Sequence, residues 1–305
     1  MCTGSVTGAM LPRLRWRDAW RAALYGPDGF FVRENPADHF RTNVAVPLFA
    51  EAVRRLADLV DEALGFPDPF DVVDVGAGRG ELLLALGDVP ARWRLTGVDV
   101  VEADVPFGWA YEIPDVTGLL VANEWLDSVP VDVLQDGRQV LVAPDGTEVC
   151  GQRVEDSWAT RWWPEGGRVE VGQPRDDAWV QAVSRVARGV AVAIDYGHTL
   201  ADRRSTLTGY RDGHQVPPVP DGSCDLTAHV ALDACAAATG AHLLTQREAL
   251  PALGICAALP ATTDPSFAMG LQRASQAREL LDPDGLGRFG WLVQAVGVDA
   301  AWMPW

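Results

Sequence analysis

The stretch at residues 70–84, FDVVDVGAGRGELLL, constrains the fold of this chain more than any other. It begins with β-branched and aromatic residues typical of a buried strand, breaks into alternate glycines, and continues with a helical pattern. A strand, a sharp glycine turn and a helix start bring backbone amides close to a ligand. The sequence therefore predicts an α/β domain with a nucleoside-binding turn.

The spacing of the glycines separates two classes of cofactor. A dinucleotide fold uses GxGxxG, whereas Gly76, Gly78 and Gly80 form GxGxG. The next residue, Glu81, would repel a diphosphate but tolerates a cationic sulfonium and an amino group. Asp99 follows Gly80 by nineteen residues, at the end of the next predicted strand, where a carboxylate can accept hydrogen bonds from ribose hydroxyls. This pattern favours S-adenosyl-L-methionine over a nicotinamide cofactor.

Composition excludes several functions. The 42 acidic and 25 basic residues give a net charge of −17, which opposes binding to nucleic acid and to anionic membranes. Every basic residue is an arginine, so chemistry that needs a lysine is excluded. The five cysteines show no CxxC spacing, and no apolar run is long enough to cross a bilayer. We expect a cytoplasmic protein without a metal ion.

The periodicity of the chain predicts alternating helices and strands around the glycine turn. The predicted helices lie at 14–24, 46–64, 176–188 and 266–281, and the predicted strands at 70–75, 95–99, 118–122, 189–194 and 289–298. Short runs separated by DG, PDG and EGG turns predict a small antiparallel insertion at about 131–173. We expect an N-terminal arm at 1–45, with a short helix and a loop that covers the cofactor, followed by one domain at 46–305.

Several motifs together resemble the MidA-like class I S-adenosyl-L-methionine-dependent methyltransferases. That family includes the mitochondrial protein arginine methyltransferase needed for assembly of respiratory complex I. The motifs are the glycine turn, GFF at 29–31, the aromatic-x-Thr segment Phe40, Arg41 and Thr42, NEWLDSVPV at 123–131, IDYG at 194–197, LTGYR at 207–211 with His214, DLTAHV at 225–230, and Gln246 with LGI at 253–255. The resemblance implies a Rossmann-like sheet of seven strands with helices on both faces.

The glycine turn and the resemblance together predict the residues that contact the cofactor. They are Asp74, Gly76, Ala77, Gly78, Gly80 and Asp99, and, from the arm that folds over the cofactor in this family, Phe31, Arg33 and Thr42. Family members carry a helix after the strand that ends near Asp99, and residues 102–113 are too short and irregular for it. This departure leaves the contacts to the adenine ring open, and Trp109 or Tyr111 could supply a stacking face.

The acids after the strand at 118–122 point to the methyl acceptor. An arginine must be gripped without engaging its attacking nitrogen, and carboxylates do this because they pair with the planar guanidinium in bidentate fashion. Glu124 and Asp127 could form that grip, while Asn123 could accept from an N–H. The alternative is that Asp127 caps a turn and Glu124 only orders the loop.

Three further residues match the family near the strand ends. Tyr196 and Asp225 are predicted to contact the substrate, with Asp225 also capping a helix at 227–238. His214 is the candidate general base, although a simple hydrogen-bonding role fits it equally well.

Four functions compete. The first is methyl transfer to an exposed arginine of a protein partner, which the acidic composition favours. The second is a methyltransferase for a small molecule, with the tryptophan-rich insertion as a hydrophobic wall. The third is an assembly factor that binds a client protein without catalysis, and the fourth is a nicotinamide dehydrogenase, which Glu81 and the missing third glycine of GxGxxG oppose.

Overall fold

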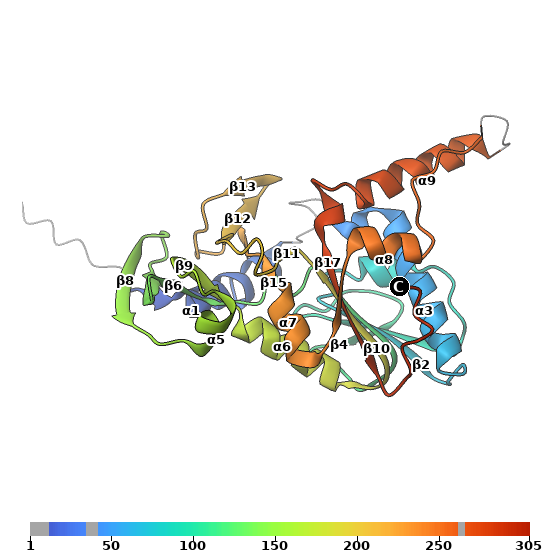
Figure 1. The fold of residues 1–305 in the computed structure, drawn as a ribbon, viewed down its shortest axis with the longest axis horizontal. Coiled ribbons are helices and arrows are strands. Elements are labelled where there is room, and N and C mark those ends of the chain that lie inside the picture. Colours follow the sequence, from blue (N-terminus) through green and yellow to red (C-terminus); the bar gives the residue numbers. More distant parts are fainter. Residues whose placement is uncertain (1–11, 35–41, 262–265) are drawn as a thin grey trace, which may run out of the picture.

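The computed structural model describes residues 12–34, 42–261 and 266–305, and its centre is a sheet of seven strands (Figure 1). In spatial order the strands are β16 (His242–Thr245), β17 (Gly290–Val296), β10 (Val186–Asp195), β5 (Val116–Asn123), β2 (Phe70–Val75), β3 (Trp93–Val98) and β4 (Gly108–Ala110). Neighbours from β10 to β4 pair in parallel, whereas β17 runs antiparallel to β10 and β16. The predicted α/β class with a largely parallel sheet is confirmed.

Helices cover both faces of this sheet. On one face lie α3 (Pro47–Ala63), α4 (Glu81–Ala85), α8 (Gln246–Ala252) and α9 (Phe267–Leu280), and on the other lie α6 (Gln173–Ser184) and α7 (Leu232–Thr239). All six residues of β2 are buried because both faces of the sheet are covered. The carboxyl ends of the parallel strands are left to form a site.

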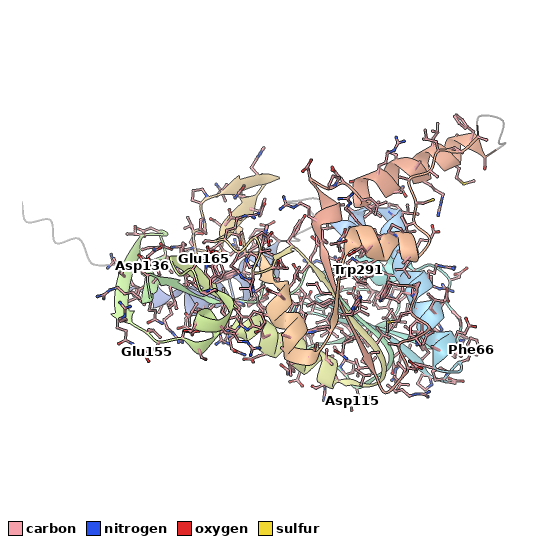
Figure 2. All side chains as sticks on the ribbon, in the orientation of Figure 1. Phe66, Asp115, Asp136, Glu155, Glu165 and Trp291 are labelled. Atoms are coloured by element: carbon pink, nitrogen blue, oxygen red, sulfur yellow. The ribbon has the colours of Figure 1, made fainter. Side chains whose placement is uncertain are left out.

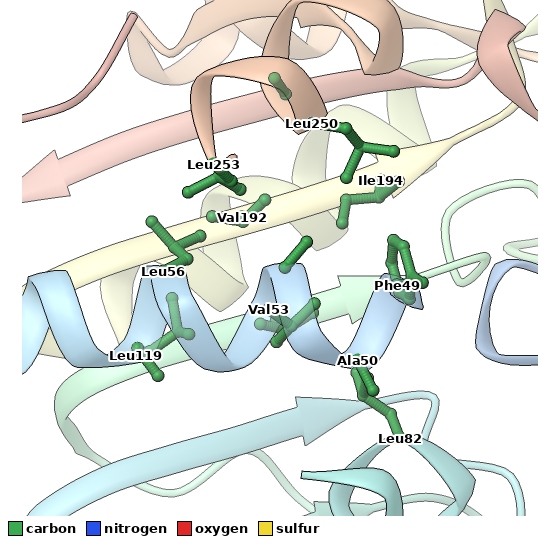
Figure 3. Packing of buried hydrophobic residues seen from close by; sticks show 14 of the residues in the cluster. Phe49, Ala50, Val53, Leu56, Leu82, Leu119, Val192, Ile194, Leu250 and Leu253 are labelled. Atoms are coloured by element: carbon green, nitrogen blue, oxygen red, sulfur yellow. The ribbon is translucent and has the colours of Figure 1, made fainter. Parts of the chain in front are cut away.

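Helix α3 shows how the sequence builds this core. Proline at its first position fits the fixed φ of that residue, and apolar side chains recur every three or four positions. Figure 3 shows these side chains packed against the sheet and α8, with labelled residues Phe49, Val53, Leu56, Leu119, Val192 and Leu250. Each fully buried side chain of this kind contributes about 1.5–3 kcal/mol to stability. The helix ends before Gly65, whose φ of 78° lies in the left-handed region.

The N-terminal segment and the insertion form a second lobe, which we define as residues 12–34 and 132–171 and which lies at the left of Figure 1. Its antiparallel sheet contains β1 (Leu14–Arg15), β6 (Asp132–Gln135), β7 (Arg138–Val142), β8 (Glu148–Arg153) and β9 (Arg168–Val171), and its helices are α1 (Trp16–Tyr25), α2 (Phe30–Arg33) and α5 (Ser157–Trp162). Trp16 and Trp20 of α1 pack against Val133 and Val140 of the sheet. The arm and the insertion therefore share one core.

Small paired segments join the lobe to the main sheet. They are β11 (Gly197–His198) with β15 (Val230–Ala231), and β12 (Thr208–Arg211) with β13 (His214–Val216) and β14 (Asp225–Thr227). The chain also forms two single turns, η2 (Asn43–Ala45) and η3 (Leu286–Arg288). The prediction that Asp225 caps a helix at 227–238 is wrong. Asp225 lies in β14 opposite Tyr210, and α7 begins only at Leu232, because residues 225–231 pair with other strands first.

The remaining sequence predictions concern the N-terminal arm and the expected absence of a segment that crosses a membrane. Phe40 and Arg41 of the predicted arm motif lie outside the described residues. The helix predicted at 14–24 starts at Trp16, because the two residues before it pair with β7. Among the described residues, no helix combines the length and apolar character needed to cross a bilayer.

Candidate active site

Two adjoining cavities lie at the carboxyl ends of β2, β3 and β5. The outer chamber, of about 650 Å³, is lined by residues that include Gly76, Gly78, Asp99, Tyr111, Trp125 and Gln181. The inner chamber, of about 100 Å³, is lined by residues that include Asp74, Asn123, Glu124, Asp127 and Asp225. The two chambers share Phe31, Gly76, Gly78, Glu124 and Ser128, so they communicate at the glycine turn.

The glycine turn forms the floor between the chambers. Gly76, Gly78 and Gly80 all have φ between 59° and 83°, a region that L residues with side chains rarely adopt. A Cβ atom on Gly76 would lie 3.0 Å from Trp125 Cδ1, and one on Gly80 would lie 2.9 Å from Phe107 Cζ. Glycine is needed at these positions both for the backbone conformation and because neighbouring side chains occupy the space that a Cβ atom would take.

Asp99 stands at the end of β3, beside the turn. Its Oδ2 accepts a hydrogen bond from Gly78 N at 2.8 Å, and its Oδ1 accepts one from Val100 N at 2.6 Å. Burial raises the pKa of Asp99, while the two backbone amides oppose that shift. Each carboxylate oxygen can accept a further hydrogen bond, so Asp99 can receive two donors from a ligand in the outer chamber.

The far wall of the outer chamber comes from α6 and from the loop after β4. Tyr111 lines this chamber, whereas Trp109 packs so tightly that a Cβ on Gly97 would lie 2.6 Å from its ring. Of the two predicted stacking residues, only Tyr111 reaches the cavity. Ala178, Gln181 and Ser184 of α6 complete the wall. Sequence analysis missed these residues because they belong to no motif and lie far along the chain from the glycine turn.

The arm roofs the outer chamber. Tyr25 and Phe31 line it, with their ring centroids 5.4 Å apart, and the Tyr25 hydroxyl lies 3.2 Å from Ser128 O and 3.3 Å from Ser128 Oγ. Thr42, a predicted cofactor contact, lines the inner chamber and not the outer one. Arg33 turns away, and its Nη2 donates to Gly222 O at 2.6 Å. Arg33 therefore ties the arm to a neighbouring loop and does not line either chamber.

Glu124 lies where the two chambers meet. It follows β5 with a φ of 53°, a left-handed conformation that costs of order 1–3 kcal/mol outside glycine. Its Oε1 accepts hydrogen bonds from Asn43 N at 2.9 Å and from Asn123 Nδ2 at 3.0 Å. Its Oε2 is buried and has no hydrogen-bond partner among the described residues. Burial, reinforced by the charge of Asp127, raises the pKa of Glu124 to about 8.

Asp127 and Asp225 extend the acidic surface of the inner chamber. Asp127 Oδ2 accepts a hydrogen bond from Thr227 Oγ1 at 2.7 Å. Its Oδ1, like Oδ1 of Asp225, is buried without a partner in the described part of the chain. Burial raises the pKa of both carboxyl groups, and Asp127 and Glu124 raise that of Asp225 further. The same cause raises the pKa of Asp74. The inner chamber thus presents carboxylate oxygens that lack donors.

Two buried charges that the sequence analysis missed hold this acidic loop in place. Asp195 Oδ2, at the end of β10, accepts hydrogen bonds from Leu126 N at 2.8 Å and from Asp127 N at 3.2 Å. Arg175 of α6 donates to Asp127 O at 2.5 Å and to Ala228 O at 2.8 Å. Arg175 therefore joins the loop after β5 to the segment that carries Asp225.

Besides Arg33, three predicted residues line neither chamber, namely Gly80, Tyr196 and His214. Tyr196 packs against Phe289, with ring centroids 3.9 Å apart. His214 is exposed on β13, at the end of the hairpin opposite Arg211. No group of three or more histidines, cysteines or acids in the described ranges could hold a metal ion. The structure therefore brings the carboxylates together without the histidine.

The insertion contributes little to the chambers. Trp158 and Trp163 pack in the core of the second lobe, each at most 6% exposed, and no residue of 132–171 lines either chamber. The tryptophan-rich segment therefore does not form the hydrophobic wall that a small-molecule acceptor was expected to use.

Comparison with known proteins adds to this geometry. A family model described as "putative S-adenosyl-L-methionine-dependent methyltransferase" matches residues 93–248, half of the chain. No curated protein matches the sequence.

Two crystal structures from Burkholderia thailandensis are similar to this chain in fold. A candidate methyl transferase bound to S-adenosyl-homocysteine shares 24% identity and a TM-score of 0.76, covering 95% of this chain and 89% of its own. The native structure of an uncharacterized protein shares 23% identity and a TM-score of 0.75, covering 96% and 90%.

Proposed function

Because the chain belongs to the MidA-like family of S-adenosyl-L-methionine-dependent methyltransferases, we propose that it methylates the guanidinium group of an arginine side chain. The observation that carries this proposal is the inner chamber. Glu124, Asp127 and Asp225 each hold a buried carboxylate oxygen there with no donor from the described residues. A guanidinium supplies five N–H donors and one positive charge, which matches these acceptors.

The outer chamber fits the cofactor of this family, S-adenosyl-L-methionine. Gly76 and Gly78 line this chamber with backbone atoms alone, and Asp99 has two acceptor positions open for the ribose hydroxyls. Tyr111 and Phe31, which line this chamber, would cover the nucleoside, and Glu124 at the chamber junction would attract the cationic sulfonium. Bound there, the cofactor supplies an electrophilic methyl group whose sulfur–carbon bond breaks as a nitrogen–carbon bond forms and one proton is released.

The residues of the chain have separate tasks in this reaction. Oε2 of Glu124 and Oδ1 of Asp127 would each accept a hydrogen bond from the guanidinium and draw its charge toward one side. Asn123 would also accept a hydrogen bond from an N–H of the guanidinium. Its side-chain amide is held in place by hydrogen bonds to Asn43 and Glu124. Because a bound cation favours the ionised form of each carboxylate, acceptor binding would lower the pKa of Glu124 below its value of about 8. Glu124 can also accept the released proton.

A protein acceptor and a cytoplasmic location are part of the proposal. The net charge of −17 favours a basic partner, and the cysteines of the described ranges are free thiols, as a reducing compartment requires. A free guanidine metabolite shares the same chemistry, and the test distinguishes the two sources.

The experiment measures methyl transfer by mass spectrometry from S-adenosyl-L-methionine. The acceptors are a pool of peptides with one arginine each, the same pool with lysine in its place, and free arginine. We expect a mass gain of one methyl group in the arginine peptides alone. Glu124→Gln should lose about 1,000-fold in turnover, because it removes a charge-assisted interaction with the reacting group.

The matched control is Glu155→Gln, which makes the same change at an exposed site on the outer side of the second lobe (Figure 2). It should retain full turnover. Methylation of the lysine pool, of free arginine alone, or of no acceptor despite cofactor binding would overturn the proposal. Equal turnover of Glu124→Gln and Glu155→Gln would remove the role given to Glu124.

A further inference from the structure

A line of buried hydrogen bonds runs from the core of the sheet to Glu124. Trp291 Nε1 lies 3.1 Å from Gln246 Oε1, and Gln246 Nε2 lies 2.9 Å from Asn43 Oδ1. Asn43 Nδ2 lies 3.1 Å from Asn123 Oδ1, and Asn123 Nδ2 lies 3.0 Å from Glu124 Oε1. Trp291, Gln246 and Asn43 are each 0% exposed, and Figure 2 shows Trp291 in the body of the main sheet.

The donor-to-acceptor direction of these hydrogen bonds is set at Trp291, where the line begins. An indole N–H can only donate, so the Gln246 atom that faces Trp291 must be the carbonyl oxygen. The amide nitrogen of Gln246 then faces three oxygens, Oδ1 of Asn43 and the carbonyl oxygens of Leu280 and Leu286 at 3.1 and 3.0 Å. Reversing this amide would bring oxygen against three oxygens and a donor against a donor. Gln246 therefore has one allowed orientation.

Each later link inherits this direction. Asn43 presents Oδ1 to Gln246, so its nitrogen must face Asn123. Asn123 accepts from Asn43 through Oδ1, so its own nitrogen faces Glu124. The line ends at Oε1 of Glu124, which faces two N–H donors and therefore acts as an acceptor whether or not Oε2 carries a proton. An indole donor and a carboxyl acceptor thus terminate a line in which every amide points the same way.

The consequence falls on the two oxygens of Glu124. Oε1 receives the Asn123 amide and the Asn43 backbone N–H, while Oε2 has no partner among the described residues and lines the chamber junction. A reversed Asn123 amide would set its oxygen against Oε1 and leave the carboxylate with one donor. Buried polar groups in a low-dielectric interior are sensitive to such a reversal.

We propose that Asn43 and Gln246 are positioning residues, which fix the direction of the Asn123 amide and thereby aim Oε2 of Glu124 at the methyl acceptor. The identity of that acceptor rests on the proposed function, whereas the orientation of Glu124 does not. Sequence resemblance singled out Gln246 without a role, and nothing in the sequence pointed to Asn43.

The experiment measures the pKa of Glu124 directly. Protein labelled with ¹³C at the glutamate side-chain carboxyl is titrated by NMR, and the resonance of Glu124 is identified by its absence in Glu124→Gln. Asn43→Leu keeps a similar volume and adds no charge, but it frees the Asn123 amide to reverse. We expect the Glu124 midpoint to rise by about one unit, because the carboxylate loses a donor.

A second variant keeps the test valid if Asn43→Leu fails to fold. Gln246→Met removes the amide that fixes the Asn43 side chain, three links from Glu124, and should raise the midpoint by about half a unit. The matched control is Trp179→Phe, since Trp179 is equally buried and donates to Thr239 Oγ1 at 3.0 Å, outside the line. Trp179→Phe should leave the midpoint unchanged.

The charges around Glu124 stay constant through this comparison. Asp127, Asp195, Asp225 and Tyr196 interact with Glu124 through space, and none is altered by the three variants. An unchanged midpoint in Asn43→Leu, or equal midpoints in Gln246→Met and Trp179→Phe, would overturn the proposal. Failure to find an arginine acceptor would contradict the proposed function alone, because the titration needs no acceptor.

Discussion

The two chambers of the site differ in how far the chain provides hydrogen-bond donors to their acidic side chains. The outer chamber has its key acid, Asp99, already engaged by two backbone amides, one of them from the glycine turn. The inner chamber has three acids with buried oxygens that no described residue engages. The key acid of the first chamber thus has donors from the chain, whereas the free oxygens of the second receive none from the described residues. An empty inner chamber is therefore a cost to the fold that a cationic ligand would offset.

They also differ in origin along the chain. Residues 76–80 and Asp99 come from two consecutive strand ends, and local spacing specifies them. The inner chamber combines the loop after β5, η2 and β14, which are far apart in sequence. A ligand site that is formed by a contiguous motif can be predicted from the sequence, whereas a site that is assembled by tertiary contacts cannot.

The largest expected effect tests the outer chamber. Asp99→Ala removes the acceptors for two ribose hydroxyls and should weaken S-adenosylhomocysteine binding by about 100-fold, since hydrogen bonds to charged groups contribute about 1.5–3 kcal/mol each. Isothermal titration calorimetry measures the affinity. Asp58→Ala, which removes an exposed carboxylate of α3, is the control and should bind as the wild type does. A loss of less than threefold in Asp99→Ala would place the ribose elsewhere.

A smaller effect tests the cost carried by the inner chamber. The pKa of Glu124 is raised to about 8 in the folded protein, so its favourable contribution is complete below its unfolded pKa and is lost as pH rises through 8. His198 and His229, with pKa values lowered to about 4, stay neutral above pH 7 in both states. Stability should therefore fall by about 1 kcal/mol from pH 7 to 8.5 through Glu124.

Urea unfolding at the two pH values measures this change. Glu124→Gln cannot titrate, so its loss of stability over the same interval should be smaller by that amount. A wild type and a Glu124→Gln variant with the same pH dependence would show that Glu124 is already ionised at pH 7. The comparison between a satisfied outer chamber and an unsatisfied inner one would then fail.

The smallest effect concerns the roof. Tyr25→Phe keeps the ring over the outer chamber but removes a hydroxyl held at 3.2 Å from the Ser128 carbonyl. We expect a loss of about 0.5 kcal/mol in urea unfolding and little change in S-adenosylhomocysteine affinity, because the bond is long. A large loss of affinity would instead make the hydroxyl a ligand contact and would sharpen the boundary between the two chambers.

The sequence predicted those parts of the molecule that local patterns specify. Apolar residues at intervals of three or four predicted α3 to within one residue at each end. Alternate glycines predicted the turn between β2 and α4. The helix expected to follow Asp225 failed, because β-pairing of 225–231 prevailed over local propensity. His214 matched a motif, yet it lies on an exposed hairpin, since a motif fixes neighbours along the chain and not across the fold.

The residues that the sequence missed share one property. Tyr25, Asn43, Arg175 and Asp195 reach the site or its frame through contacts with segments distant in the chain. A tyrosine at the end of a helix or a buried arginine carries no signal of its own. Arg175 in particular binds carbonyl oxygens, and no spacing rule identifies which carbonyl groups will need a donor.

The position of β17 carries a consequence for how the enzyme matures. This strand inserts between β10 and β16, and it brings Trp291, the first donor of the line that ends at Glu124. During synthesis the glycine turn and Glu124 leave the ribosome well before Trp291 does. A nascent chain can therefore form the glycine turn early, while the side chain of Glu124 gains a fixed orientation only when the last strand of the sheet has inserted between its neighbours.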